Sequence, residues 1–372
     1  MKEYRIAVDL GTTTVEVAII DGLGNIISTA SFNNPQSLYG RDVINRIMTT
    51  TRDNKYILIM KNMFIDKLKE CLNDLINKNS LEFNSFKAMC ICGNTTMISI
   101  LLEYDLKELG VFPFKHKLDK SIKTNSLKLF GDDFPLDINI YLSGCFSAFI
   151  GGDCLAGLMS LDDYIFKDKP KSILFMDLGT NGELVLYSDN KYYCTSTACG
   201  PAFESCCRSG NAYGSNLIDA ITLGIKTGKI SREGILKDDY LEDGIELMGI
   251  EITADILREI LVAKAAISTG IKCLFNEARL NLNNVDVVYI PGGFGFHMNT
   301  LNATTIGLLP KELSGKIKIV GNASLKGAIS LVNCPSKLDL LDGFKTNDVK
   351  LVQMANLPDY QEMLIENMNF KE

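Results

Sequence analysis

The sequence predicts an α/β protein built from two related lobes with a cleft between them. The chain has 372 residues, more than the roughly 100–200 of a typical single domain, so two separate cores are expected. Apolar runs typical of strands alternate with segments of helical periodicity, which indicates parallel sheets covered by helices. The tetrapeptide Asp-Leu-Gly-Thr occurs at Asp9 and again at Asp177, each time after a strand and before a hairpin. We therefore place the lobes at residues 1–165 and 166–372.

The first lobe opens with a meander of three strands separated by glycine-containing turns. Two helical stretches follow, then a short buried strand and further helices. The polar stretch 115–137 is weakly periodic and is interpreted as a surface excursion. The expected elements are strands Arg5–Asp9, Thr14–Ile20, Asn25–Ala30 and Lys87–Cys92, and helices Asp42–Thr50, Ile57–Asn77, Thr95–Leu102 and Phe146–Leu161.

The second lobe repeats the opening meander and then alternates helices with strands. Its later strands end in glycine-containing turns, Pro-Gly-Gly-Phe-Gly at one and Gly-Asn-Ala-Ser at the next. The expected elements are strands Ser172–Asp177, Glu183–Tyr187, Lys191–Ser196, Val285–Ile290 and Lys316–Val320, and helices Thr253–Ala278 and Ala323–Val332.

Composition excludes several classes of protein. Apolar residues are 46% and charged residues 22% of the chain, which excludes disorder, collagen-like repeats and coiled coil as the main architecture. A net charge of −7 gives no general attraction to nucleic acid or anionic lipid. Apolar runs stay below the roughly 20 residues that span a bilayer, and the N-terminus lacks the apolar core of a signal peptide. We expect a cytoplasmic protein without a nucleic-acid or membrane partner.

The eleven cysteines are expected to be reduced thiols in that compartment. Neither Cys-x-x-Cys nor the plant-type ferredoxin spacing occurs, and the chain has only two histidines, His116 and His297. The sequence therefore does not predict a zinc site of ordinary spacing. Most of the thiols are interpreted as small buried apolar side chains.

The two Asp-x-Gly-Thr hairpins are the strongest functional signal. Glycine after the strand permits a tight turn and close approach to a ligand, and the next residues present hydroxyl, amide and backbone N–H donors suited to phosphate oxygens. An aspartate at the strand end suits Mg²⁺ held through water. One copy would be a plain hairpin, but two copies favour phosphate binding. The predicted residues are Asp9, Gly11, Thr12, Thr13, Asp177, Gly179, Thr180 and Asn181.

Three further positions have both a functional and a structural interpretation. Gly292, Gly293 and Gly295 form either a plain loop or a bare backbone surface for adenine and ribose. Asn322 is either a helix N-cap or part of the same nucleoside site. Asp153 starts a helix after two glycines, where it is either favoured by the helix dipole or acts as a base that positions water. A P-loop motif is missing.

These features in this order resemble the acetate and sugar kinase/heat-shock cognate/actin (ASKHA) superfamily. The resemblance implies two ribonuclease-H-like lobes with ATP and Mg²⁺ in the cleft between them. It also puts Asp153 at the position of the superfamily's catalytic acid.

A closer resemblance rests on motifs that extend from about residue 4 to the last twenty residues. They are similar to those of the ATP-dependent reductive activators of corrinoid proteins. The motifs are Asn34-Pro35-Gln36, Tyr39-Gly40-Arg41-Asp42-Val43, Gly93-Asn94-Thr95-Thr96-Met97, Phe112-Pro113-Phe114, Asp177 to Glu183, Gly200-Pro201-Ala202-Phe203-Glu204, Gly214 to Asp219, Lys264-Ala265-Ala266-Ile267, Gly292 to Gly295 and Gly307-Leu308-Leu309-Pro310.

This resemblance implies a homodimeric ATPase that drives low-potential electron transfer, returning Co(II) of a corrinoid protein, or a similar metalloenzyme partner, to its reduced state. ATP binding or hydrolysis would shift the equilibrium between two states of a hinge, and the partner would respond to the state that is populated. Lys264 would face the nucleotide, although a lone lysine is more often solvated. The rival interpretations are a small-molecule kinase of the same fold and a non-redox, ATP-gated scaffold or regulator.

The chain departs from those activators at its N-terminus. They usually begin with a 2Fe–2S ferredoxin domain, whereas this sequence begins at the ATPase core, so we expect either a separate ferredoxin or a cluster of its own. The related 2-hydroxyacyl-CoA dehydratase activators hold one 4Fe–4S cluster between two subunits. By resemblance its ligands here would be Cys154 and Cys199. The alternative is that both are buried thiols without a metal.

Overall fold

Two units, each with its own sheet and its own hydrophobic core, make up the protein. The computed structural model describes residues 2–161, 171–179, 181–199, 214–343 and 349–370. The first unit comprises Met1–Lys167 and Asn322–Asn347, and the second comprises Asp168–Gly321 and Asp348–Glu372. Residues 322–347 thus return to the first unit, whereas the sequence analysis placed them in the second lobe. They return because α12 (Ala323–Asn333) packs on the first sheet and on α5.

The first unit has a six-stranded sheet in the order β3-β2-β1-β4-β6-β5. β1, β2 and β3 form the predicted antiparallel meander, while β4 and β6 continue from β1 in parallel. The strands are β1 (Tyr4–Leu10), β2 (Thr14–Asp21), β3 (Ile26–Asn33), β4 (Phe86–Gly93), β5 (Ile122–Asn125) and β6 (Asn139–Leu142); the helices are α1 (Val43–Arg52), α2 (Lys55–Lys78), α3 (Thr95–Leu101), α4 (Ser126–Phe130), α5 (Gly152–Met159), α12 and α13 (Lys337–Gly343).

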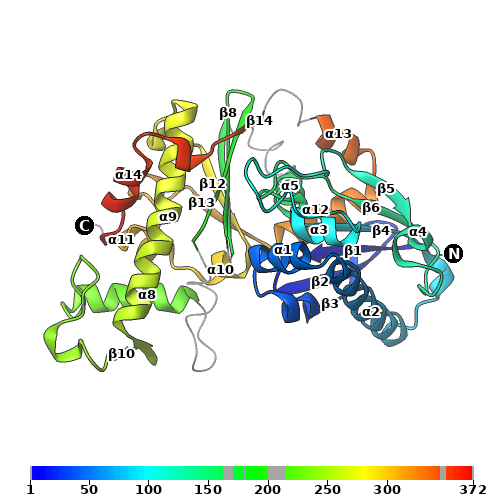
Figure 1. Ribbon diagram of the computed structural model, residues 1–372, viewed down its shortest axis with the longest axis horizontal. Helices are drawn as coiled ribbons and strands as arrows, with labels where there is room; N and C mark the ends of the chain where they lie inside the picture. Colours follow the sequence, from blue (N-terminus) through cyan, green and yellow to red (C-terminus); the bar gives the residue numbers. More distant parts are fainter. Residues whose placement is uncertain (1, 162–170, 180, 200–213, 344–348, 371–372) are drawn as a thin grey trace. The chain divides into compact units, whose positions relative to one another are not determined.

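The second unit repeats the meander and the two parallel strands in the order β13-β12-β7-β8-β9-β14, and its sixth strand, β14, pairs in parallel with β9 at the meander edge. Its long helix α9 lies against the sheet (Figure 1) and begins at the N-cap Thr253, whose side chain accepts from the Ile256 N–H. The strands are β7 (Ser172–Leu178), β8 (Gly182–Ser188), β9 (Lys191–Thr197), β12 (Val287–Pro291), β13 (Ile317–Gly321), β14 (Val349–Leu351) and the small hairpin β10 (Ile245–Leu247) and β11 (Ile250–Ile252); the helices are α8 (Gly214–Lys226), α9 (Ala254–Ala278), α10 (Gly292–His297), α11 (Thr300–Thr305) and α14 (Tyr360–Glu366).

The α/β fold class and the repeated meander are confirmed, three local predictions are corrected, and several elements, β6 and α8 among them, were not predicted. The stretch 115–137 contains the edge strand β5 and helix α4 in addition to surface loop. The helix predicted from Phe146 starts only at Gly152. The Gly292–Gly295 segment starts the helix α10, where an open turn was expected.

The alternation of β1 decides which side chains face which helix. Ile6, Val8 and Leu10 belong to the same hydrophobic cluster as the apolar residues of α2. Asp9 is one residue out of phase with them and therefore lies on the opposite face, where Ser324 at the start of α12 donates to it. α12 approaches α5 so closely that a Cβ on Gly327 would lie 2.0 Å from the Ala156 carbonyl oxygen. The small residues at this contact thus allow α12 and α5 to pack closely. Asn322 and Ser324 lie at the start of α12, and Asp153 lies at the start of α5.

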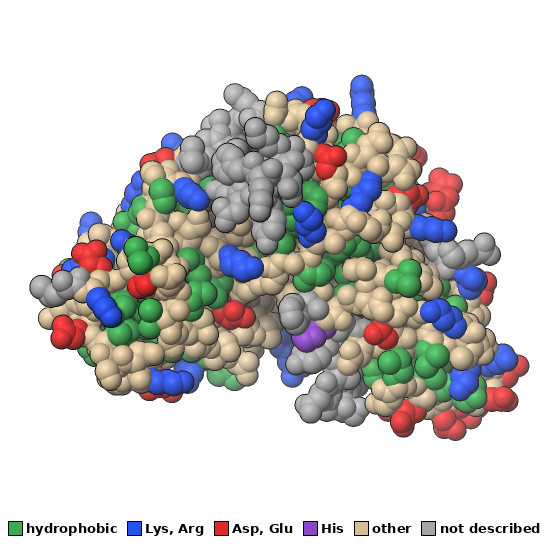
Figure 2. Space-filling view, turned by 180° about the vertical axis from the view of Figure 1, so that it is seen from behind, with side chains coloured by type: hydrophobic (Ala, Val, Ile, Leu, Met, Phe, Trp, Pro, Cys, Tyr) green, Lys and Arg blue, Asp and Glu red, His purple; other side chains and the backbone are tan. Residues whose placement is uncertain are grey.

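The described surface carries mixed charge. Acidic side chains of the second unit gather around β10, where Asp238, Asp239, Glu242, Asp243 and Glu246 are exposed (Figure 2). Among the described residues, no helix has both the length and the apolar character to cross a membrane.

Candidate functional site

Polar side chains of the first unit gather at the carboxyl ends of the parallel strands β1 and β4. Asp9 lies near the end of β1, Asn94 directly follows β4, and Asn322 directly precedes α12. In open α/β sheets, ligands bind at the carboxyl ends of parallel strands. The topology thus brings together residues that are far apart in the sequence.

The turn after β1 is held by side chains from two other segments. A Cβ on Gly11 would lie 2.5 Å from the Thr14 carbonyl oxygen, so only glycine fits there. Asn34 Nδ2 donates to the Gly11 carbonyl at 2.8 Å, and Asn94 Nδ2 donates to Thr12 Oγ1 at 2.9 Å. Thr13 is exposed. The predicted phosphate-binding turn is therefore preorganised, with Thr13 open to solvent.

Asp9 lies in a polar cluster that the sequence analysis identified only in part. Its Oδ1 accepts from Ser324 Oγ at 2.7 Å, and its Oδ2 accepts from Asn322 Nδ2 at 2.9 Å. The same Asn322 amide donates to Glu16 Oε2 at 2.9 Å. The pKa of Asp9 is raised from 3.8 to about 6, chiefly by desolvation; the hydrogen bonds from Ser324 and Asn322 oppose this rise, and the nearby Glu16 charge adds to it.

Glu16 was not predicted as a site residue. The register of the strands identifies it, because the register places Glu16 opposite Asp9. Asp9 pairs directly with Glu16 across β1 and β2, and Asp177 pairs with Glu183 across β7 and β8. Like charges directly opposite each other destabilise a sheet. Such a carboxylate pair recurs at both hairpins, and carboxylate oxygens are suitable ligands for a hydrated Mg²⁺. The donor set fits magnesium.

Asp153 reaches the same end of the sheet because two glycines precede it. A Cβ on Gly151 would lie 2.4 Å from Asn94 Cα, and one on Gly152 would lie 2.0 Å from Ser143 Oγ. Without side chains at these positions, the start of α5 can lie directly against the residues that follow β4. Asp153 Oδ1 accepts from the Cys154 N–H at 2.8 Å.

The second unit presents an equivalent turn. Asp177 lies near the end of β7, and the Gly179 N–H donates to the Asn181 carbonyl at 3.0 Å. Gly292 has a φ of +82° at the end of β12, and a Cβ there would lie 4.0 Å from Asp177 Oδ1. Gly293 and Gly295 continue α10, and Gly295 packs against Ile290. Thr180 lies outside the described residues.

Two residues that were predicted to bind the nucleotide, Asn322 and Lys264, contact protein groups. Asn322 belongs to the first unit, where it contacts Asp9 and caps α12 by accepting from the Leu325 N–H at 2.8 Å. Lys264 is fully buried on α9, and its Nζ donates to the Asn369 carbonyl at 2.6 Å. Their roles in binding ATP stay predictions.

The two candidate cluster ligands are buried within their own units. Cys154 is 1% exposed and Cys199 is 4% exposed, and the Cys199 thiol donates to the Gly179 carbonyl at 3.6 Å. Over the described ranges, no group of three or more His, Cys, Asp or Glu side chains is placed to hold a metal. The assignment of Cys154 and Cys199 as cluster ligands stays a prediction.

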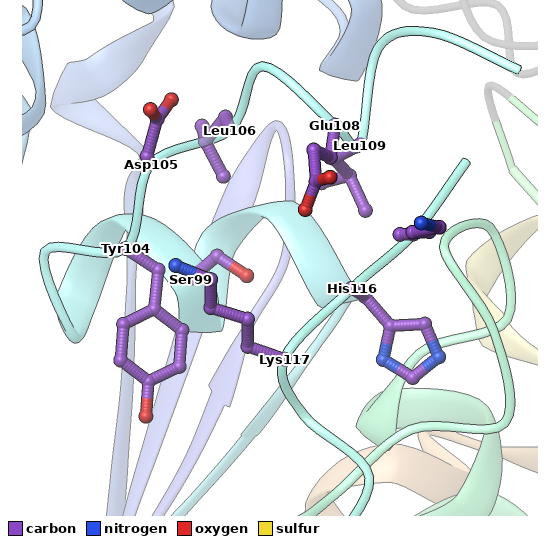
Figure 3. A pocket seen from close by; sticks show the side chains of 9 residues that line it. Ser99, Tyr104, Asp105, Leu106, Glu108, Leu109, His116 and Lys117 are labelled. Carbon is purple, nitrogen blue, oxygen red and sulfur yellow. The ribbon is translucent and has the colours of Figure 1, made fainter. Parts of the chain in front are cut away.

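A separate pocket of the first unit lies beside α3 (Figure 3). Lys117 Nζ lies 5.8 Å from the Tyr104 ring centroid at this pocket, and Ser99, Asp105, Glu108 and His116 also line it. The predicted ATP residues are not among its lining residues.

Comparisons with known proteins agree on one family. The profile described as the RACo middle region matches residues 4–163. The profile described as the C-terminal domain of RACo, the ASKHA domain, matches residues 171–211 and 209–372.

The chain is also similar to individual proteins. It is 29% identical to the corrinoid activation enzyme RamQ of Eubacterium limosum, over 87% of this chain and 63% of RamQ. It is 22% identical to the [Co(II) methylated amine-specific corrinoid protein] reductase of Methanosarcina barkeri, over 90% of this chain and 71% of that protein. A solved reductive activator for corrinoid, iron–sulfur protein has the same fold, with a TM-score of 0.85 at 24% identity over 99% of this chain and 66% of that one. The chain thus spans a little under two thirds of RamQ and of the solved activator.

Proposed function

The chain belongs to the RACo family, and on this premise we propose that it is an ATP-dependent reductive activator. It would couple ATP binding or hydrolysis to low-potential electron transfer to a corrinoid protein or a similar metalloenzyme. The names of the two curated relatives support a corrinoid partner. The observation that carries the nucleotide part is the Asp9–Glu16 pair, bridged by Asn322 at the end of β1.

Each residue has a defined task in this proposal. The Gly11–Thr13 turn, held by Asn34 and Asn94, binds phosphate oxygens. Asp9 and Glu16 would hold a hydrated Mg²⁺, which would neutralise phosphate charge when bound. Asp177 and Asn181 of the second hairpin, with the backbone of Gly292, supply further contacts to the nucleotide.

Asp153 is assigned to the attacking water. The carboxylate accepts a proton from a water positioned at the terminal phosphate and so acts as a general base. Gly151 and Gly152 let α5 begin close to Asn94, which itself contacts Thr12. Nucleotide binding then shifts the population of a two-state protein, and a partner that binds one state preferentially is coupled to the nucleotide.

The test of the function is the oxidation state of cobalt. A corrinoid protein in the Co(II) state is mixed with this protein, ATP, Mg²⁺ and a low-potential electron donor such as reduced ferredoxin. We expect the Co(I) spectrum to appear only when ATP and this protein are both present. ADP formation stimulated by a small metabolite and not by the corrinoid protein would instead indicate a kinase. ATP binding without any Co(I) would indicate a scaffold or regulator.

The electron donor is proposed to be separate from the residues described. Anaerobically purified and reconstituted protein is expected to hold no stoichiometric cluster at Cys154 and Cys199, because both thiols are buried. Iron and acid-labile sulfide are measured in the wild type and in the variants Cys154→Ser and Cys199→Ser, with Cys273→Ser, another buried thiol, as a matched control. Stoichiometric iron that is lost in the first two variants and kept in the control would reverse this assignment. The homodimer stays a prediction, to be checked by light scattering.

A further inference from the structure

Arg46 is a buried cation directly behind the Gly11–Thr13 turn. It lies on α1, is fully buried and is among the largest buried side chains of the described residues. Its Nη2 donates to the Thr12 carbonyl at 2.5 Å, its Nε donates to the Gly40 carbonyl at 2.9 Å, and its Nη1 donates to Gln36 Oε1 at 3.3 Å. The guanidinium thus ties the turn to α1.

All three of these acceptors are neutral. Within the described parts of the chain, no Asp or Glu forms an ion pair with Arg46. Burial lowers its pKa to about 10, and the charge of Asp42 acts in the opposite direction, so the guanidinium remains charged at neutral pH. Burying a charge without an opposite charge is costly. A methionine or leucine would fill such a site without this cost, so packing alone does not explain the arginine.

We propose that Arg46 is a positioning residue for the Gly11–Thr13 turn and the built-in counter-charge for a polyphosphate bound there. This inference rests on the proposed nucleotide function. In the ligand-free protein the guanidinium hydrogen-bonds to neutral acceptors, and the charge of Asp42, the N-cap of α1, acts on it without an ion pair. A bound polyphosphate supplies a further negative charge beyond the Thr12 carbonyl, across a medium of low dielectric constant, where the attraction is stronger than in water. The turn therefore has its binding conformation and a positive charge behind it before the ligand binds.

A structural tie without an electrostatic role is the competing explanation. Under that explanation Arg46 matters only through its hydrogen bonds, and neutralising its charge in place would leave phosphate binding unchanged. Gln36 offers the means, because its Oε1 contacts Arg46 Nη1 and its side chain is 1% exposed. Gln36→Glu keeps an acceptor at that position and adds the missing negative charge.

The experiment measures the dissociation constants of ATP with Mg²⁺ and of adenosine by calorimetry. The variants are Gln36→Glu, Arg46→Lys and Arg46→Gln, with Arg52→Gln, an exposed arginine of the same helix, as the matched control. We expect Gln36→Glu and Arg46→Gln to weaken ATP binding by about tenfold or more, which corresponds to about 1.4 kcal/mol. Adenosine binding should stay within about twofold. Arg46→Lys, which keeps the charge, should retain most of the ATP affinity.

The outcomes separate the hypotheses. Thermal melts accompany every variant, because Gln36 Nε2 also donates to the Met60 carbonyl at 3.2 Å and its loss affects stability. Unchanged ATP binding in folded Gln36→Glu, or equal losses in Arg46→Lys and Arg46→Gln, would overturn the counter-charge. A wild-type protein that binds neither ATP nor ADP would overturn the proposed function and this inference together. If the wild type binds ATP and the Gln36 and Arg46 variants bind it equally well, the inference about Arg46 is overturned and the proposed function stands.

Discussion

Replacing Asp9 by asparagine is expected to slow Mg²⁺-dependent ATP hydrolysis strongly and, at the same time, to stabilise the ligand-free protein at neutral pH. The carboxylate faces Glu16 across the hairpin, so the metal site loses half of its charge in the variant. The hydrogen bonds can persist, because the amide oxygen can accept from Asn322 and the amide nitrogen can donate to the Ser324 hydroxyl. We expect hydrolysis to fall by roughly two orders of magnitude or more, as for the loss of a metal-bound charge at a phosphoryl group.

The gain in stability follows from the raised pKa of Asp9. That pKa is 3.8 for an ordinary aspartate and about 6 in the fold, so the folded state holds the proton more tightly than the unfolded state. The stabilisation from the protonated form is complete below pH 3.8 and is lost as pH rises through about 6. Each pKa unit corresponds to about 1.4 kcal/mol. Asp9→Asn should therefore be more stable than wild type by about 1–3 kcal/mol at pH 7.5, and by much less at pH 4.

Urea unfolding at the two pH values, without nucleotide or metal, measures this difference. Asp132→Asn serves as the matched control, because Asp132 is exposed and the same substitution there should leave both stability and hydrolysis unchanged. Equal stability of Asp9→Asn and wild type at pH 7.5 would show that the Asp9 charge carries no cost. Full hydrolysis by Asp9→Asn would remove Asp9 from the metal site.

The parts of the site that the sequence predicted are those with a local pattern. Asp9, Gly11 and Thr12 belong to one turn, and the turn recurs at Asp177, so spacing and repetition are enough to find them. The same local logic gave the meander strands, since period-two alternation and turn residues are visible along the chain.

The missed parts depend on contacts between distant segments. Glu16 becomes visible only through the register of β1 and β2, and Arg46 only through its burial against Thr12. Asn322 was expected in the second lobe but belongs to the first unit, together with α12. Sequence order alone does not determine on which sheet a helix near the C-terminus packs. Gly292 was assigned to a turn because glycine favours turns. Its positive φ serves instead to start α10 at the end of β12.

Replacing Asp153 by asparagine should slow ATP hydrolysis while leaving ATP binding intact. The carboxylate is assigned to a water molecule and not to the nucleotide itself, so its loss affects the transition state and leaves the ground state unchanged. Loss of a general base typically costs about 10²–10⁴-fold in rate. Asparagine keeps an oxygen that can accept from the Cys154 N–H, so the first turn of α5 should be preserved.

Single-turnover experiments measure the rate of ATP hydrolysis, and calorimetry measures the dissociation constant of ATP. The matched control is Asp105→Asn, because Asp105 also accepts from a nearby backbone N–H, that of Lys107 at 3.0 Å, but lies outside the site. We expect the control to hydrolyse ATP at the wild-type rate and Asp153→Asn to bind ATP within about threefold of wild type. If Asp153→Asn loses binding and rate in equal proportion, Asp153 contacts the bound nucleotide or its metal. If it keeps the full rate, the water is positioned by another group, and α5 serves to place Gly151 against Asn94.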